Sequence, residues 1–243
     1  MPSKTVMVDG GYRFPGRWVG GVALVAGPLV WLTGVLLRLP FDFFFPQQLA
    51  AYALAPDQMF AASSCVLAGQ LLVALGVAAA ADLIGRTRPG LATWGGLLVV
   101  LGLFARTFHA GADHLAFQLV APLGVQPATE VIGRTYGAAH IVAALNPAIM
   151  FGWPVLALGA WRAGVLPWWR ALALASMAAL MLGVLKGSSW TSVACTSGLA
   201  IAFVPLGVRV LLDGPRPRTA VVAAWAIGVP ILMGLAYAFG RLG

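Results

Sequence analysis

Long, uninterrupted apolar segments restrict the possible folds of this chain more than any other feature. Each holds about 20 residues, the length at which a helix crosses the hydrocarbon core of a bilayer. Because 60% of the residues are hydrophobic and only 9% are charged, the chain cannot bury this much apolar surface in a water-soluble core. We expect an all-α, multi-pass membrane protein with seven transmembrane helices, at Trp18–Leu39, Met59–Leu83, Leu91–Val120, Tyr136–Trp161, Trp168–Lys186, Trp190–Leu212 and Thr219–Gly240.

The same segments argue against a transmembrane β-barrel. Barrel strands alternate polar and apolar residues, whereas these segments are continuous runs rich in Ala, Leu, Val and Gly. No linker is long enough to separate two folded units, so we expect residues 18–243 to form a single transmembrane domain and residues 1–17 a basic N-terminal arm. The first apolar segment is too long for the hydrophobic region of a signal peptide, so we expect no cleavage.

The positive charges favour one orientation in the membrane. The formal charge is +8, but the basic residues stand singly or in pairs at the ends of the apolar segments, which is typical of membrane topology rather than of nucleic-acid binding. With the N-terminus inside, ten of the 15 Lys and Arg residues fall on the cytoplasmic side and five fall on or toward the other side. We therefore expect a protein of the cell membrane, with its N-terminus in the cytoplasm and its C-terminus outside.

The third apolar segment contains a cluster of ionisable side chains in the sequence RTFHAGADH: Arg106, His109, Asp113 and His114. A charge in or near hydrocarbon costs several kcal/mol, so such a cluster persists mainly where it faces a protein interior or a water-filled cavity. Helical spacing places the first three of these side chains on the same face as Phe117, where they can touch. In the alternative interpretation, the helix ends near Gly111 and the last two residues cap it in water.

Further polar side chains lie in the outer halves of the predicted helices. Gln70 is in the second helix, His140 and Asn146 are in the fourth, and a group of Ser and Thr residues opens the sixth. The first and seventh helices hold almost no polar residues. We therefore expect the second, third, fourth and sixth helices to line a cavity and the first and seventh to lie at the periphery. We expect Cys65 and Cys195 to be free thiols.

Several catalytic motifs are absent from the sequence. It contains no Walker A loop, no H-E-x-x-H, no G-x-S-x-G and no aspartate-rich D-D-x-x-D motif. ATP hydrolysis, zinc proteolysis, hydrolase chemistry of that type and magnesium-dependent prenyl transfer therefore lack their usual residues. We expect no metal and no cofactor, and chemistry that one protonatable group can start.

A small seven-helix bundle with sparse intramembrane acids, many aromatic residues and no metal motif resembles the integral-membrane terpene cyclases of fungal meroterpenoid and bacterial indole-sesquiterpenoid pathways. The likeness is one of architecture and size across most of the chain, and no motif matches residue by residue. It implies a helical bundle that protonates an alkene or epoxide and cyclises a polyprenyl chain. The partners would be a lipophilic small molecule and the lipid bilayer.

Such a reaction needs a dry carboxylic acid, aromatic faces for the carbocation and no nearby water. We assign the acid to Asp113 with His109 as its hydrogen-bond partner, and Asp42 and Glu130 are the alternative acids. The candidate substrate-binding residues are Arg106, His114, Phe117, His140, Asn146, Gln70, Trp190 and Lys186. The candidate aromatic residues are Phe60, Phe104, Phe108, Phe117, Tyr136 and Trp190. An anionic head group would be held by Arg106, Arg134 or Lys186.

Two other functions stay open. His109, His114 and His140 are the only histidines, and ligation by two of them on neighbouring helices would suit a haem- or quinone-linked membrane protein. A small transporter or immunity protein could instead use Arg106 and Asp113 as a gate. A transport path would also need polar groups in the inner halves of the helices, which are nearly free of them.

Overall fold

The computed structural model describes residues 14–135, 140–180, 185–215 and 217–240. Every regular element in these residues is a helix, which confirms the expected fold class. The chain divides into two compact units, Met1–Leu211 and Leu212–Gly243. Most of the expected basic arm, and the candidate aromatic residue Tyr136, lie outside the described residues.

Among the described residues, six helical segments are long and apolar enough to cross a membrane. Each overlaps one of the expected spans, and the chain is a multi-pass membrane protein by the length and composition of its helices. The segments are α1 (Arg17–Arg38), α3 (Pro56–Gly85), α4 (Pro89–Leu123), the 3₁₀ turn η1 (Ile141–Leu145) continued by α6 (Asn146–Arg162), α8 (Trp190–Leu212) and α9 (Thr219–Gly240).

The expected fifth span is not a continuous helix, so seven spanning helices are not confirmed. The segment begins as α7 (Trp168–Ala175) and the 3₁₀ turn η2 (Ser176–Ala179), after which Leu180 is extended and residues 185–189 are not helical. Residues 185–189 read LKGSS. Glycine is a poor helix former, and serine side chains compete for backbone hydrogen bonds, which explains the break. We call residues 168–189 the broken crossing.

The broken crossing runs along α8 and then to the connection after α1. Arg170 Nε donates to the carbonyl of Ile201 at 3.1 Å, near the middle of α8. The thiol of Cys195, one of two free cysteines as expected, donates to the carbonyl of Ser176 at 3.1 Å. The N–H of Gly187 donates to the carbonyl of Phe43 at 2.8 Å. The described residues of the segment therefore extend from α8 to the connection after α1, although Leu180 and residues 185–189 are not helical.

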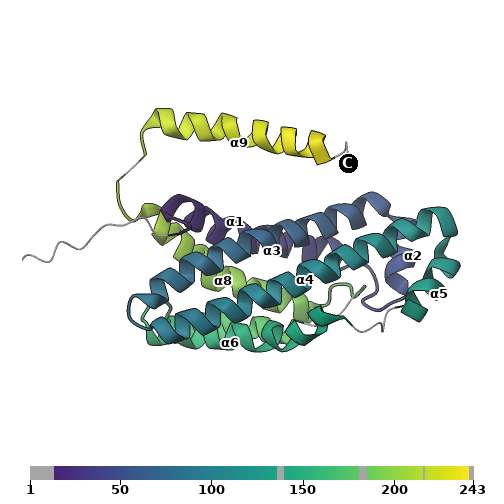
Figure 1. Cartoon of the computed structure of the whole chain (residues 1–243), viewed down its shortest axis with the longest axis horizontal. Coiled ribbons are helices and arrows are strands. Elements are labelled where there is room, and N and C mark those ends of the chain that lie inside the picture. Colours follow the sequence, from purple (N-terminus) through teal and green to yellow (C-terminus); the bar gives the residue numbers. More distant parts are fainter. Residues whose placement is uncertain (1–13, 136–139, 181–184, 216, 241–243) are drawn as a thin grey trace, which may run out of the picture. The chain divides into compact units, whose positions relative to one another are not determined.

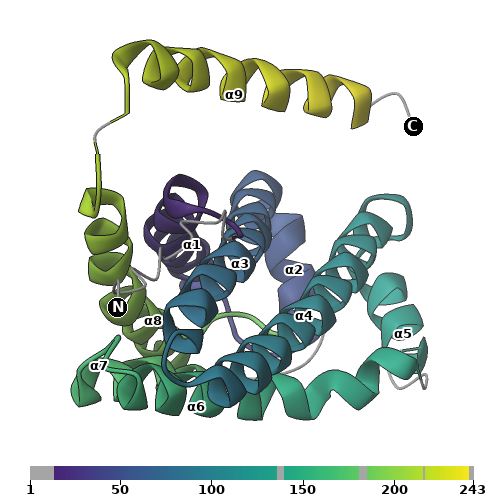
Figure 2. The same cartoon turned by 60° about the vertical axis from the view of Figure 1, so that its left-hand side comes forward.

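Glycines spaced seven residues apart bring the long helices into backbone contact. A Cβ atom on Gly69 would lie 2.5 Å from the backbone nitrogen of Trp31, and one on Gly95 would lie 2.7 Å from the Cα of Leu156. Membrane helices associate through this kind of close packing between small residues. It joins α1 to α3 and α4 to α6, which run side by side in Figures 1 and 2. The glycines are Gly20, Gly27 and Gly34 in α1, Gly69 and Gly76 in α3, Gly95 and Gly102 in α4, and Gly152 and Gly159 in α6.

Helix α1 is not peripheral, so that prediction was wrong. It packs along α3, and Gly21 lies against Leu211 of α8. Trp31 and Arg38 of α1 are buried. The prediction rested on the scarcity of polar residues in this helix, but its glycines are what place it inside the first unit. Helix α9, in the second unit, has no buried residue.

Two short helices occupy the connections that follow α1 and α4. They are α2 (Gln47–Leu54) and α5 (Val125–Thr135), which contact each other and α4 at one end of the long helices (Figure 1). A cluster of buried apolar side chains, separate from the main core of the first unit, lies at this end and includes Leu49, Met59 and Phe117. We call it the second apolar cluster. Phe41 and Phe45 of the first connection pack against this cluster, which anchors the connection at that end.

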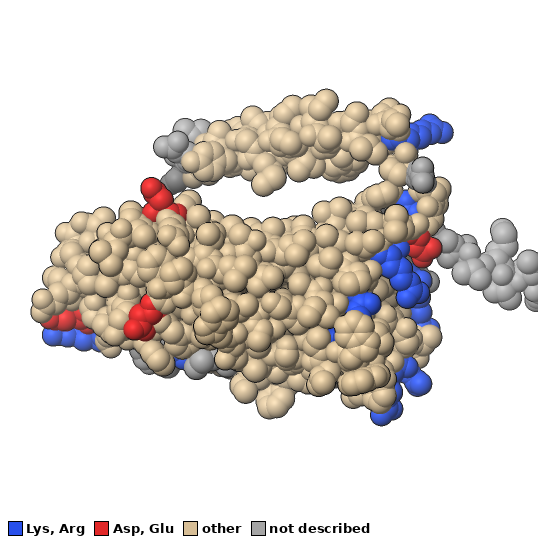
Figure 3. Space-filling model, turned by 180° about the vertical axis from the view of Figure 1, so that it is seen from behind, with Lys and Arg blue, Asp and Glu red and all other residues tan. Residues whose placement is uncertain are grey.

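On the face that Figure 3 shows, charged side chains gather toward the ends of the first unit and leave between them a band without charged side chains. Arg88 Nε donates to the carbonyl of Arg162 at 3.4 Å, at the end of α4 and α6 that is distant from α2 and α5. This distribution is the one that a bilayer requires, because charges are costly in hydrocarbon and favourable at its edges.

We predict that Gly95→Ala destabilises the bundle, because the added methyl group would overlap the backbone of Leu156. Overpacking of this kind costs about 1–3 kcal/mol, and it should lower the midpoint of thermal unfolding in detergent. Gly111→Ala is the matched control, since Gly111 lies in the same helix and its Cβ would meet nothing within 4 Å. Equal midpoints for the two variants would contradict the close contact between α4 and α6.

Candidate intramembrane binding site

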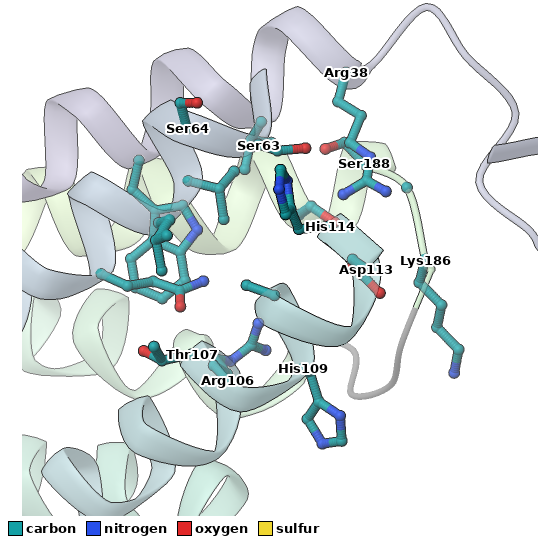
Figure 4. A pocket seen from close by; sticks show the side chains of 18 of the residues that line it. Arg38, Ser63, Ser64, Arg106, Thr107, His109, Asp113, His114, Lys186 and Ser188 are labelled. Carbon is teal, nitrogen blue, oxygen red and sulfur yellow. The ribbon is translucent and has the colours of Figure 1, made fainter. Parts of the chain in front are cut away.

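A cavity of about 390 Å³ lies between α1, α3 and α4. Leu180 and residues 186–188 of the broken crossing, Ile149 of α6 and Ser192 of α8 complete its wall. The volume falls within the range of small-molecule sites. Figure 4 shows polar side chains that reach this cavity from three helices and from the broken crossing.

Arg106 and Asp113 both bind the backbone of the broken crossing. Arg106 Nη2 donates to the carbonyl of Leu180 at 3.2 Å, and the Asp113 carboxylate accepts a hydrogen bond from the N–H of Leu185. Non-helical backbone at membrane depth is tolerated only where protein or water satisfies its polar groups. Both side chains therefore stabilise the crossing. Helix α4 continues to Leu123, so the interpretation in which it ends near Gly111 is wrong.

His109 turns away from Asp113 in Figure 4. Its ring centroid lies 5.8 Å from that of Phe108 and 5.9 Å from that of His140. In the part of the chain that the structure describes, no hydrogen bond joins His109 to Asp113. The expected acid–histidine pair is therefore not formed, although the two residues share a helix.

His109, His140 and Asn146 form a second polar group. The Nδ1 atoms of both histidines and Oδ1 of Asn146 are buried and have no hydrogen-bond partner among the described residues. The ring centroid of Phe108 lies 4.8 Å from that of His140 and 5.8 Å from that of His109, so the three rings pack together. Within the described ranges, no group of three or more His, Cys, Asp or Glu residues could hold a metal ion.

Arg38, the last residue of α1, is held at the cavity wall by α2. It is 7% exposed. Its Nε donates to Oε1 of Gln48 at 2.6 Å, and the Gln48 amide donates in turn to the backbone carbonyl of Asp42. The guanidinium carbon lies 5.7 Å from the ring centroid of Phe117. These contacts fix the position of the guanidinium group.

Besides Nδ1 of His109, other polar atoms at the cavity wall are buried and have no hydrogen-bond partner within the described residues. They include Nη2 of Arg38, Oγ of Ser63 and Oε1 of Gln70. Buried polar groups in proteins are nearly always paired. These atoms can therefore form hydrogen bonds with a molecule in the cavity.

The structure brings six of the predicted site residues to the cavity: Gln70, Arg106, His109, Asp113, His114 and Lys186. Of these, the ammonium group of Lys186 points away from Arg38 in Figure 4. His140 and Asn146 are instead part of the group beside His109.

Four predicted residues lie elsewhere. The Asp42 carboxylate accepts a hydrogen bond from the N–H of Phe44 at 3.0 Å in an exposed turn. Glu130 lies 4.0 Å from Arg134 on α5, with its side chain 60% exposed. Trp190 is exposed, and Phe117 stacks on Tyr52 in the second apolar cluster. Neither alternative acid is therefore part of the cavity wall.

The aromatic part of the wall differs from the prediction. Phe60 lines the cavity, but Phe104 is exposed and Phe108 packs against the histidines. Trp31 and Phe43, which were not predicted to have this role, also line it. The guanidinium carbon of Arg106 lies 5.8 Å from the Trp31 ring, so this aromatic side chain already contacts a cation.

Sequence reasoning also missed Arg38, Gln48 and Ser188. Arg38 was counted only as one of the few basic residues on the outer side. Its position on the outer side was the available signal, because basic residues are usually concentrated on the cytoplasmic side of a membrane protein. For Gln48 and Ser188 there was no signal, because both lie in connections whose path the sequence does not define.

Comparison with known proteins adds no assignment. No protein-family model, no curated protein sequence and no solved structure matches this chain.

Gln48→Ala should destabilise the protein, because Nε of Arg38 would lose its partner in a buried environment. A buried donor left without a partner costs about 1–3 kcal/mol, and more when it is charged. Thermal unfolding in detergent, followed by circular dichroism, measures the effect. Gln118→Ala is the control, since that exposed amide only contacts the Tyr52 hydroxyl at 3.5 Å. A wild-type midpoint for Gln48→Ala would mean that this hydrogen bond does not hold the cavity wall.

Proposed function

We propose that this protein is an integral-membrane cyclase, which binds an isoprenoid chain in the cavity and cyclises it after protonation by Asp113. The observation that carries the proposal is that Asp113 lines the same cavity as Trp31 and Phe60. An acid and aromatic faces are the two requirements of a protonation-initiated cyclisation. The resemblance to the integral-membrane terpene cyclases supports the same reaction class.

In the proposed reaction the Asp113 carboxylic acid donates its proton to an alkene carbon or to an epoxide oxygen. A second double bond of the same chain attacks the resulting cation, which closes a ring and moves the positive charge. The ring faces of Trp31, Phe43 and Phe60 would stabilise that charge. Loss of a proton from the product cation to the Asp113 carboxylate regenerates the acid, so the reaction consumes no cofactor.

The hydrogen bond from Leu185 N–H is made to Oδ1 of Asp113. It leaves Oδ2 as the oxygen that would transfer the proton. Because His109 packs against His140 instead, we assign the orienting role to the Leu185 backbone.

We further propose that the protein lies in the cell membrane with its N-terminus in the cytoplasm and its C-terminus outside. Ten of the 15 basic residues fall on the cytoplasmic side in this orientation. The broken crossing then supplies the seventh passage. The cavity would lie in the outer half of the bilayer, so a lipid substrate would enter it from the membrane.

Reporter fusions test this orientation. A reporter after Pro89 or after Arg216 should be cytoplasmic, and one at the C-terminus should be external. The C-terminal fusion is the decisive one, because it depends on whether the broken crossing passes through the membrane. A cytoplasmic C-terminus would contradict the seven passages and leave only six.

Asp113→Asn should abolish cyclisation while substrate still binds. The amide keeps the shape and can still accept the bond from Leu185, but it cannot donate the proton. Loss of one acid–base group lowers a rate by about 10²–10⁴-fold or more. Turnover of farnesyl and geranylgeranyl compounds, free or joined to an aromatic unit, measures the effect in membranes. EDTA should change little, because the reaction as proposed uses no metal.

Glu130→Gln is the matched control, because its carboxylate lies on the exposed surface of α5. It should retain wild-type turnover. If Asp113→Asn cyclises normally and Glu130→Gln does not, Asp113 is not the acid. If the wild type turns over none of these compounds, the cyclase proposal fails.

A second candidate function is favoured by the contact between His109 and His140. Two half-buried imidazoles, whose buried Nδ1 atoms have no partner among the described residues, could hydrogen-bond the carbonyl oxygens of a quinone. A quinone extracted from purified protein that turns over no isoprenoid would select this function. The core at the end of the helices opposite α2 and α5 is apolar, and this disfavours a transport path, which would need polar groups there.

A further inference from the structure

Arg38 has more hydrogen-bonding capacity than the protein uses. It is buried, with 7% of its surface exposed, and its Nε is bound to Gln48. Its Nη2 atom is buried and has no partner among the described residues. A charged donor left in this state is costly. The guanidinium also lines the cavity, so a bound molecule could supply the missing acceptor.

Asp113 is not that acceptor. It lines the same cavity, but no salt bridge within 4.0 Å joins it to Arg38 in the described part of the chain. Its Oδ1 atom is bound to the backbone of Leu185. The two side chains thus line a common space and remain separate.

The charges at the cavity wall favour an anion. Arg38, Arg106 and Lys186 are cationic, and Asp113 is the single carboxylate among the lining residues. Ser63 Oγ, also without a described partner, can donate a further hydrogen bond. In Figure 4 the Ser63 and Ser188 hydroxyl groups and the Arg38 guanidinium point toward the same part of the cavity.

Another part of the wall is apolar. Trp31, Phe60, Leu67 and Ile149 lie there, on helices that are long and apolar enough to cross a membrane. A ligand that satisfies both parts of the wall has a charged head and an apolar chain. A guanidinium group binds carboxylate and phosphate oxygens through paired hydrogen bonds.

We propose that Arg38, with Ser63 and Ser188, binds the oxyanion head group, a phosphate or a carboxylate, of the lipophilic molecule that occupies the cavity. This inference rests on the proposed function only in that a lipophilic molecule enters the cavity. It does not depend on Asp113 or on cyclisation. Arg38 takes the head-group role that sequence analysis gave to Arg106, Arg134 or Lys186.

Three probes with one chain separate the head group from the tail: farnesyl phosphate, farnesoic acid and farnesol. Their binding to the full-length protein in dodecyl maltoside can be measured by quenching of tryptophan fluorescence, because Trp31 lines the cavity. Wild-type protein should bind the two anions more tightly than farnesol. Arg38→Gln should weaken binding of the anions by about 10- to 100-fold and leave farnesol binding unchanged.

Arg134→Gln is the matched control, because this arginine belongs to α5 at the same end and its side chain is 83% exposed. It should bind all three probes as the wild type does. Ser188→Ala is a smaller change that should fold in any case, and it should weaken binding of the anions but not of farnesol. Unchanged farnesol binding in Arg38→Gln also serves as the measure that this variant is folded.

The outcomes separate the two proposals. The head-group site would be overturned if Ser188→Ala weakened binding of all three probes equally, or if a folded Arg38→Gln bound the anions as tightly as the wild type. Either result would leave the cyclase proposal untouched.

Inorganic phosphate separates a lipid ligand from a free anion. If millimolar inorganic phosphate displaced farnesyl phosphate and left farnesol binding unaffected, the site would bind a free anion, and the proposal that its ligand is lipophilic would be overturned. Tight anion binding without turnover in the wild type would support this site while the cyclase fails. If the wild type binds none of the probes, both proposals fall.

Discussion

The fold depends on one requirement of the bilayer: every backbone N–H and C=O inside it must find a partner within the protein. Continuous helices meet this requirement by themselves, and the glycine contacts then bring α1 to α3 and α4 to α6. The broken crossing does not meet it. Arg106 and Asp113 supply the missing partners at Leu180 and Leu185, so the costly charges in α4 are explained first by the backbone that they bind.

Asp113 and Arg38 are each bound to the protein by one part of the side chain and line the cavity as well. Asp113 is held by a backbone bond on one oxygen and lines the same cavity as Trp31 and Phe60, which is the arrangement that the proposed proton donor needs. Arg38 is held in the same way by Gln48 and keeps part of its guanidinium for the cavity. Binding and proton transfer are thus assigned to different side chains from different helices. An anionic ligand at Arg38 would lie in the same cavity as the acid.

Sequence patterns were sufficient for those parts of the structure in which local composition decides the outcome. The six spanning helices and the polar group in α4 follow from long apolar runs and from the cost of charge in hydrocarbon. The break after Leu180 did not follow, because LKGSS is short and its apolar flanks masked it. The partners of Asp113 also escaped prediction: helical spacing placed His109 within reach, but it could not describe contacts from residues more than 70 positions away. The seven-residue glycine spacing was present in the sequence and would have placed α1 correctly.

The separation in sequence of the bonds to the broken crossing has a consequence for biosynthesis. They join residues 74 and 72 positions apart. Arg106 and Asp113 therefore enter the membrane well before Leu180 and Leu185 have been translated. The α1–α3 and α4–α6 pairs can assemble earlier, since all four helices precede the broken crossing. The cavity can accordingly be completed only after these two helix pairs, and a nascent chain that stops short of Leu185 would carry the four helices without a complete binding site.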